Sequence, residues 1–141
     1  MICYFDTSAI VPLVVAEPSS ALCQRLWNEA DAVATTRMSY VEAAAALAQA
    51  LRMHRLTHKD HGSALRILDR LWNEFEIVEV DEPLTRRAAE LAHRCALRGY
   101  DAVQCASAAQ LEDDDLVIAG GDRQLLEACA TLGLAVADIN H

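Results

Sequence analysis

The chain has 141 residues, of which 53% are hydrophobic, so it can build one domain with a buried core, and disorder is not expected. Its formal net charge of −9 argues against a protein that holds nucleic acid through bulk electrostatic attraction. No apolar run approaches the ~18 residues of a membrane span. Asp6 interrupts the first apolar stretch, which no basic region precedes. We therefore expect a soluble, cytoplasmic protein without a signal peptide.

Five short apolar segments are predicted to be strands. They are Ile2–Phe5, Ala32–Thr35, Glu76–Val80, Leu116–Ala119 and Leu134–Ala137. Helical segments with polar or proline-containing starts lie between them. These begin near Thr7, Ser20, Ser39, Thr57, Asp81, Tyr100 and Asp122. Gly99 and Gly133 are placed to end two helices, and Gly120-Gly121 is predicted to be a tight turn. Alternation of this kind predicts an α/β fold, with a parallel sheet of about five strands and helices on both faces. Neither repeats nor linkers interrupt residues 1–141, so we expect one domain.

Five cysteines are spread along the chain, and no two lie within four residues of each other. They are Cys3, Cys23, Cys95, Cys105 and Cys129. The spacing lacks the close pairs of a zinc site. Most of them sit in apolar segments, which favours buried free thiols in a reducing compartment.

Four acidic residues stand out by their positions. Asp6 directly follows one predicted strand, and Asp122 follows another after a Gly-Gly pair. Neighbouring parallel strands would bring these two carboxylates together at the carboxyl edge of the sheet, where open α/β sheets place their sites. Glu42 and Asp101 lie in Ala- and Val-rich helical segments, where an unpaired carboxylate is costly.

Carboxylates brought together repel one another unless a cation lies between them. Oxygen ligands suit a hard cation such as Mg²⁺ or Mn²⁺. The four acids taken together therefore predict a metal site for phosphate chemistry. Ser8, two residues after Asp6, is placed to hydrogen-bond a carboxylate or a metal-bound water of that site without binding the metal ion itself.

Each acid also has a plainer interpretation. Asp6, Asp101 and Asp122 all stand where an Asp can cap a helix, and Glu42 lies three residues after Ser39 in the spacing of a capping box. A phosphoaspartate mechanism for Asp6 would want a second Asp two residues on, where this chain has Ser8. Only the combination of the four acids favours the metal site over helix caps.

One stretch of the chain is locally basic. Arg52, Arg55 and Lys59 lie in it, together with three histidines that lack a zinc-binding spacing. A solvated helical surface and a surface that contacts RNA or a partner protein remain equal alternatives for it.

The chain resembles the PIN-domain proteins, and within them the VapC-type toxin ribonucleases of prokaryotic toxin–antitoxin pairs. The resemblance spans essentially the whole chain. It is carried by four segments in order, namely DTSAIVPLVVAEPSS, SYVEAAAAL, YDAVQCASAAQL and GGDRQLLEAC. It implies that Asp6, Glu42, Asp101 and Asp122 form a Mg²⁺ or Mn²⁺ site. Family members often have Thr or Ser two residues before the last acid, where this chain has Gly120.

This resemblance implies a metal-dependent endoribonuclease that acts as a toxin, forms a homodimer and binds a small antitoxin. In the family the antitoxin often inserts a basic side chain among the carboxylates. A catalytically inert PIN-like module that binds RNA or protein is the alternative. The missing hydroxyl at Gly120 gives this alternative some weight, and the presence of all four acids counts against it. A phosphoryl-accepting signalling domain would want a Lys in the site, but the only Lys, Lys59, lies in the basic stretch.

Overall fold

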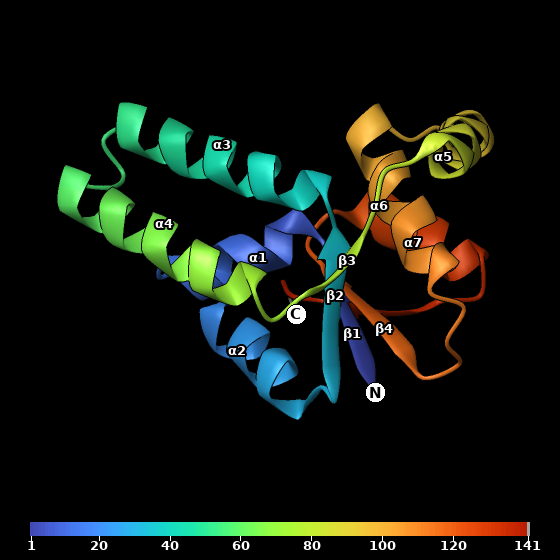
Figure 1. Cartoon of the computed structure of the whole chain (residues 1–141), viewed down its shortest axis with the longest axis horizontal. Helices are drawn as coiled ribbons and strands as arrows, with labels where there is room; N and C mark the ends of the chain where they lie inside the picture. Colours follow the sequence, from blue (N-terminus) through green and yellow to red (C-terminus); the bar gives the residue numbers. More distant parts are fainter. Residues whose placement is uncertain (141) are drawn as a thin grey trace.

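A computed structural model of the chain describes residues 1–140, which form a parallel sheet with helices on both faces (Figure 1). The sheet has five strands in the order β3-β2-β1-β4-β5. In chain order the strands are β1 (Ile2–Phe5), β2 (Ala32–Thr36), β3 (Glu76–Val78), β4 (Leu116–Gly120) and β5 (Ala135–Asp138). The predicted α/β class, with about five parallel strands, is confirmed.

The helices form two groups, one on each face of the sheet. The first group is α1 (Thr7–Val14), α2 (Ser20–Glu29), α3 (Met38–Arg52) and α4 (His58–Trp72). The second is α5 (Glu82–Cys95), α6 (Gly99–Gln110) and α7 (Arg123–Thr131). In Figure 1, α3 and α4 run side by side as a hairpin that extends away from the sheet.

Strand β1 lies at the centre of the sheet and supplies both halves of the core. Cys3 and Phe5 pack among α1–α4, whereas Tyr4 between them packs among α5–α7. This alternation is the period of two expected of a strand that is covered on both faces. Phe5 also belongs to an aromatic cluster, in which the rings of Trp27 and Phe75 stand edge to face with centroids 5.2 Å apart.

Two glycine predictions were wrong. Helix α5 ends at Cys95, because Ala96 takes the left-handed conformation (φ 53°), and Gly99 begins the next helix instead of ending α5. Gly120 is the last residue of β4, where it pairs with Asp138 of β5, so it is not part of a turn.

No helix within residues 1–140 is both long enough and apolar enough to cross a membrane. The feature of the fold that matters most for function is the edge where β1 and β4 end. Because these strands are paired in register, Phe5 opposite Ala119, the residues that follow them meet at one place.

Candidate metal centre

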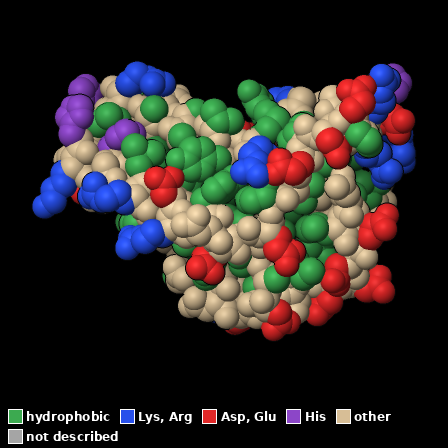
Figure 2. Space-filling model, viewed as in Figure 1, with side chains coloured by type: hydrophobic (Ala, Val, Ile, Leu, Met, Phe, Trp, Pro, Cys, Tyr) green, Lys and Arg blue, Asp and Glu red, His purple; other side chains and the backbone are tan. Residues whose placement is uncertain are grey.

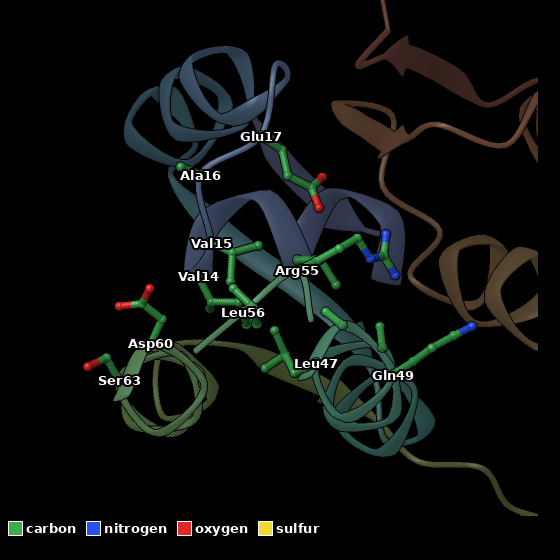
Figure 3. A pocket seen from close by; sticks show the side chains of 13 residues that line it. Val14, Val15, Ala16, Glu17, Leu47, Gln49, Arg55, Leu56, Asp60 and Ser63 are labelled. Carbon is green, nitrogen blue, oxygen red and sulfur yellow. The ribbon is translucent and has the colours of Figure 1, made fainter. Parts of the chain in front are cut away.

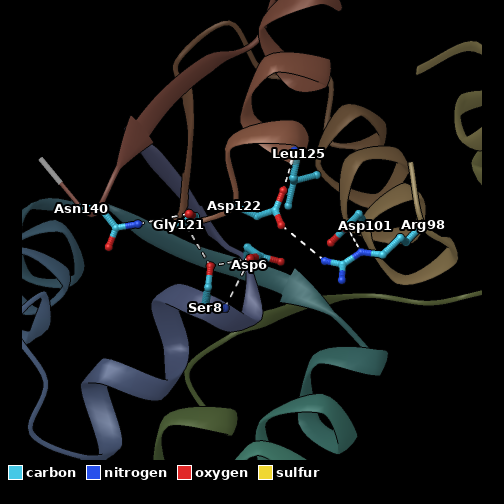
Figure 4. A network of polar contacts seen from close by, with 8 residues as sticks. All are labelled: Asp6, Ser8, Arg98, Asp101, Gly121, Asp122, Leu125 and Asn140. Carbon is cyan, nitrogen blue, oxygen red and sulfur yellow. Dashed lines mark hydrogen bonds and ion pairs between the residues drawn. The ribbon is translucent and has the colours of Figure 1, made fainter. Parts of the chain in front are cut away.

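Asp6 is the most enclosed of the four acids, with only 6% of its surface exposed. Its backbone N–H donates to Ala119 O (3.0 Å), which fixes it beside the end of β4. Its side chain caps α1 by accepting from Ser8 N (3.3 Å), and the Ser8 hydroxyl donates to Asp6 Oδ2 (2.5 Å). Ser8 Oγ in turn accepts from Gly121 N (2.8 Å), so Ser8 links the Asp6 carboxylate to the loop after β4 (Figure 4).

Burial raises the pKa of Asp6 from its ordinary value of 3.8 to about 6. The two hydrogen bonds from Ser8 lower this pKa, while the negative charges of Glu42 and Asp101 raise it further. Within residues 1–140, no positively charged side chain forms a hydrogen bond or ion pair with Asp6.

Glu42 is held by a polar network inside the helix layer. Gln104 Nε2 donates to Glu42 Oε1 (2.9 Å) and lies 3.0 Å from Ser39 Oγ, and the Thr7 hydroxyl also donates to Glu42 Oε1 (3.1 Å). The buried Tyr4 hydroxyl donates to Gln104 Oε1 (2.6 Å), which fixes which way the Gln104 amide faces. The network thus joins β1, α1, α3 and α6 around one carboxylate.

The capping-box interpretation of Glu42 was wrong. Helix α3 begins at Met38, before Ser39, and Arg37 at its N-cap makes no side-chain capping bond. Ser39 is buried within the helix and accepts from the Thr35 hydroxyl (2.7 Å). Glu42 therefore faces Thr7 and Gln104 instead of the start of its own helix.

Asp101 and Asp122 share one guanidinium. Arg98 Nε donates to Asp101 Oδ2 (3.0 Å) and Arg98 Nη2 donates to Asp122 Oδ2 (3.3 Å), so the arginine lies across both acids (Figure 4). Asp122 also caps α7, since Leu125 N donates to its Oδ1 (2.9 Å). Asp101 lies in the first turn of α6, whose N-cap is Arg98, so the expected capping role belongs to Asp6 and Asp122 but not to Asp101.

The donors fit a hard divalent cation in their chemistry, because all four are carboxylates and the buried Asp6 has no positive partner among residues 1–140. As the side chains stand within residues 1–140, no three acids, histidines or cysteines are grouped closely enough to hold a metal ion. The guanidinium of Arg98 forms ion pairs with two of these acids, Asp101 and Asp122. The carboxylates Asp101 and Asp122 and, more weakly, Glu42 raise its pKa above the usual value.

Residues 3–130 match the family model described as the PIN domain, a span that contains all four acids. The chain belongs to the PIN domain family. This PIN domain is 40% identical over 134 residues to Ribonuclease VapC45 of Mycobacterium tuberculosis (strain CDC 1551 / Oshkosh), a match covering 95% of this chain and 93% of VapC45. Ribonuclease VapC49 of M. tuberculosis (strain ATCC 25618 / H37Rv) matches with the same identity and coverage. The expected resemblance to PIN and VapC proteins is confirmed.

The crystal structure of PAE2754 from Pyrobaculum aerophilum superimposes on this PIN domain with a TM-score of 0.73 and 25% sequence identity. The match covers 99% of this chain and 93% of PAE2754. The arrangement of strands and helices described above is therefore shared over the full length of the domain.

The locally basic stretch lies far along the α3–α4 hairpin. Arg52, Arg55 and Lys59 are exposed where α3 turns into α4, and we call these three residues the basic tip. Figure 2 shows Lys, Arg and His side chains gathered over this end of the molecule, whereas Asp and Glu side chains are spread over much of the remaining visible surface. At 1.5 Å per residue, the ten residues from Glu42 to Arg52 span about 15 Å of helix.

A pocket of about 720 Å³ with mixed polar and apolar walls lies between α1 and the α3–α4 hairpin (Figure 3). Val14, Leu47 and Leu56 are among the residues lining it, and Arg55 of the basic tip lies at its wall. None of the four acids borders this pocket. The acidic site and the pocket are therefore separate features of this PIN domain.

Sequence reasoning missed three side chains that contact the four acids, namely Thr7, Gln104 and Arg98. Gln104 was detectable, because a lone amide in the buried run of α6 must find partners. Arg98 carried no comparable signal, since an exposed arginine before a helix is ordinary and its contact with Asp122 spans 24 residues of sequence.

Proposed function

We propose that this protein is a Mg²⁺- or Mn²⁺-dependent endoribonuclease and the toxin of a toxin–antitoxin pair. The observation that carries the proposal is the buried, uncompensated Asp6 at the carboxyl edge of the sheet, close enough to Glu42 and Asp101 for their charges to raise its pKa. The names of the two ribonucleases that are 40% identical to it support RNA as the substrate class.

In this proposal Asp6, Asp101 and Asp122 bind the metal ion, and Glu42 binds it directly or through water. A bound divalent ion supplies Lewis-acid activation of the scissile phosphate and of the attacking water. Ser8 holds the Asp6 carboxylate in place through Oδ2, and Gln104 and Thr7 orient Glu42.

We further propose that residues 1–141 act as one domain, that the protein forms a homodimer, and that a small antitoxin covers the acidic site in the cytoplasm. The acidic cluster suits a basic side chain of such a partner. The cysteines within residues 1–140 are all free thiols, which fits a reducing compartment.

Cleavage of total RNA with Mg²⁺, Mn²⁺ or EDTA tests the enzymatic part of the proposal. We expect the parent to cleave with metal and not in EDTA, and Asp6→Asn, which is nearly isosteric, to lose cleavage and toxicity on expression. An inert binding module would show no cleavage with any metal, and its cellular effect would survive Asp6→Asn. Cleavage that persists in EDTA would contradict the metal-dependent mechanism.

The basic tip is proposed to contact the RNA backbone. Replacing Arg52, Arg55 and Lys59 by Gln should reduce the slope of log affinity against log salt by about 2, because each phosphate contact to single-stranded RNA contributes about 0.7. An unchanged slope would mean that the basic tip does not contact the RNA and faces solvent or a protein partner instead.

A further inference from the structure

Arg98 is joined to the acidic site by side-chain contacts alone. Its side chain is 76% exposed, whereas those of Asp101 and Asp122 are only 13% and 33% exposed. As the N-cap residue of α6, it makes no side-chain capping bond to that helix. Its guanidinium therefore lies at the rim of the site and faces inward to two carboxylates, one in the first turn of α6 and one at the N-cap of α7.

A local ion pair does not explain this arrangement. The contact with Asp101 three residues on is the kind of pair found along many helix surfaces. The contact with Asp122 is different, because α6 and α7 are separated by β4 and each carboxylate comes to Arg98 from its own element. The forked guanidinium suits two acceptors at once, as a Lys ammonium would not.

Arg98 also engages oxygens that a metal ion would need. Asp122 Oδ1 accepts from Leu125 N and its Oδ2 accepts from Arg98, so both oxygens already have donors. Asp101 Oδ2 is likewise engaged by Arg98 Nε. This pairing coincides with the lack, within residues 1–140, of any three acids grouped closely enough for a metal ion.

We infer that Arg98 is an internal counter-cation that competes with the divalent metal, so that the ion must displace its guanidinium from Asp101 and Asp122 to bind. This inference rests on the function proposed above. Because the Arg98 pairs are open to solvent and screened by salt, the competition is modest, and the exposed side chain is free to swing outward. Arg98 thus sets the concentration of metal ion that the site requires.

Arg86 provides a matched control. It forms an exposed ion pair with Glu82 on α5 (2.8 Å), and the side chains of the two residues are 77% and 72% exposed. Arg86→Gln therefore removes the same charge and the same type of contact as Arg98→Gln, but away from the acidic site.

The experiment is a Mn²⁺ titration by isothermal calorimetry, paired with thermal melts over the same Mn²⁺ series, on the parent, Arg98→Gln, Arg98→Lys and Arg86→Gln. We expect Arg98→Gln to bind Mn²⁺ about threefold more tightly than the parent at low salt, with the difference shrinking at high salt. Arg98→Lys should lie between the two, and Arg86→Gln should match the parent.

Unchanged or weaker Mn²⁺ binding in Arg98→Gln, while the parent binds, would overturn the inference and leave the metal site standing. Weaker binding would mean that Arg98 pre-arranges the carboxylates instead of competing for them. Binding by neither the parent nor Arg98→Gln would overturn the proposed metal centre and this inference together. If Arg86→Gln also bound Mn²⁺ more tightly, the effect of Arg98→Gln would come from the change in net charge alone, and the inference would be overturned.

Discussion

Replacing Asp6 by Asn should stabilise the metal-free protein in a pH-dependent manner. Asp6 has an ordinary pKa of 3.8 and a pKa of about 6 in the folded protein, mainly because it is buried. Between these values the native state holds a proton that the unfolded chain has lost, so the stability of the parent falls as pH rises from about 4 to about 6. A pKa difference of this size lowers the free energy of unfolding by about 3 kcal/mol at most.

The measurement is urea unfolding in EDTA at several pH values from 4 to 7.5. We expect the free energies of unfolding of parent and Asp6→Asn to be close near pH 4. The variant should then become the more stable of the two by up to about 3 kcal/mol at pH 7.5. The asparagine side chain keeps an oxygen that can accept from Ser8, so the hydrogen bond from the Ser8 hydroxyl does not have to be lost.

Asp114→Asn is the matched control, because Asp114 is exposed and the substitution removes the same charge. This control should not change the pH dependence. A stability difference between Asp6→Asn and the parent that is constant from pH 4.5 to 7.5, or a variant less stable than the parent at neutral pH, would refute the reasoning. Added Mn²⁺ should raise the melting temperature of the parent but not that of Asp6→Asn.

Three further predictions concern packing and the polar network. Gly120→Ala should destabilise the fold by about 1 kcal/mol in urea unfolding, because its Cβ would lie 3.3 Å from Asp6 Cβ. Gly99→Ala meets nothing within 4 Å and should stabilise the fold by about 0.5 kcal/mol; equal effects of the two changes would contradict this contact argument. Gln104→Leu should cost about 2 kcal/mol, because it leaves buried polar partners unpaired, whereas the exposed Gln110→Leu should change stability by less than about 0.5 kcal/mol. A thiol reagent should label the half-buried Cys95 of the native protein before the buried cysteines, and a fast labelling phase that survives Cys95→Ser would count against the burial described here.

The position of Asp6 and Asp122 could be predicted from sequence, because the strands they follow are short apolar runs and parallel strands bring their carboxyl ends together. The capping roles of the same two residues were also visible. The role of Glu42 was ambiguous, because Ser39 three residues before it mimics a capping box, and only the start of α3 at Met38 excludes that interpretation.

Side-chain partners distant in sequence were beyond the reach of pattern analysis. Tyr4 and Gln104 meet across the sheet–helix layer, and Arg98 meets Asp122 across α6 and β4, but neither contact has a characteristic spacing. Glycine was also misleading, because Gly99 begins a helix and Gly120 ends a strand, positions that do not require its conformational freedom.

The basic tip is a positively charged end on a molecule whose net charge is −9. A polyanion approaching such a protein is repelled by most of the surface and attracted by the end of the α3–α4 hairpin. At low salt this combination of repulsion and attraction rotates the protein before contact, so that the hairpin end meets the polyanion first. Above about 0.1 M salt the Debye length falls below about 10 Å, and the orienting effect is confined to the last moments of encounter. Ionic strength therefore acts on the speed of association through this charged end, in addition to its effect on the affinity of the final complex.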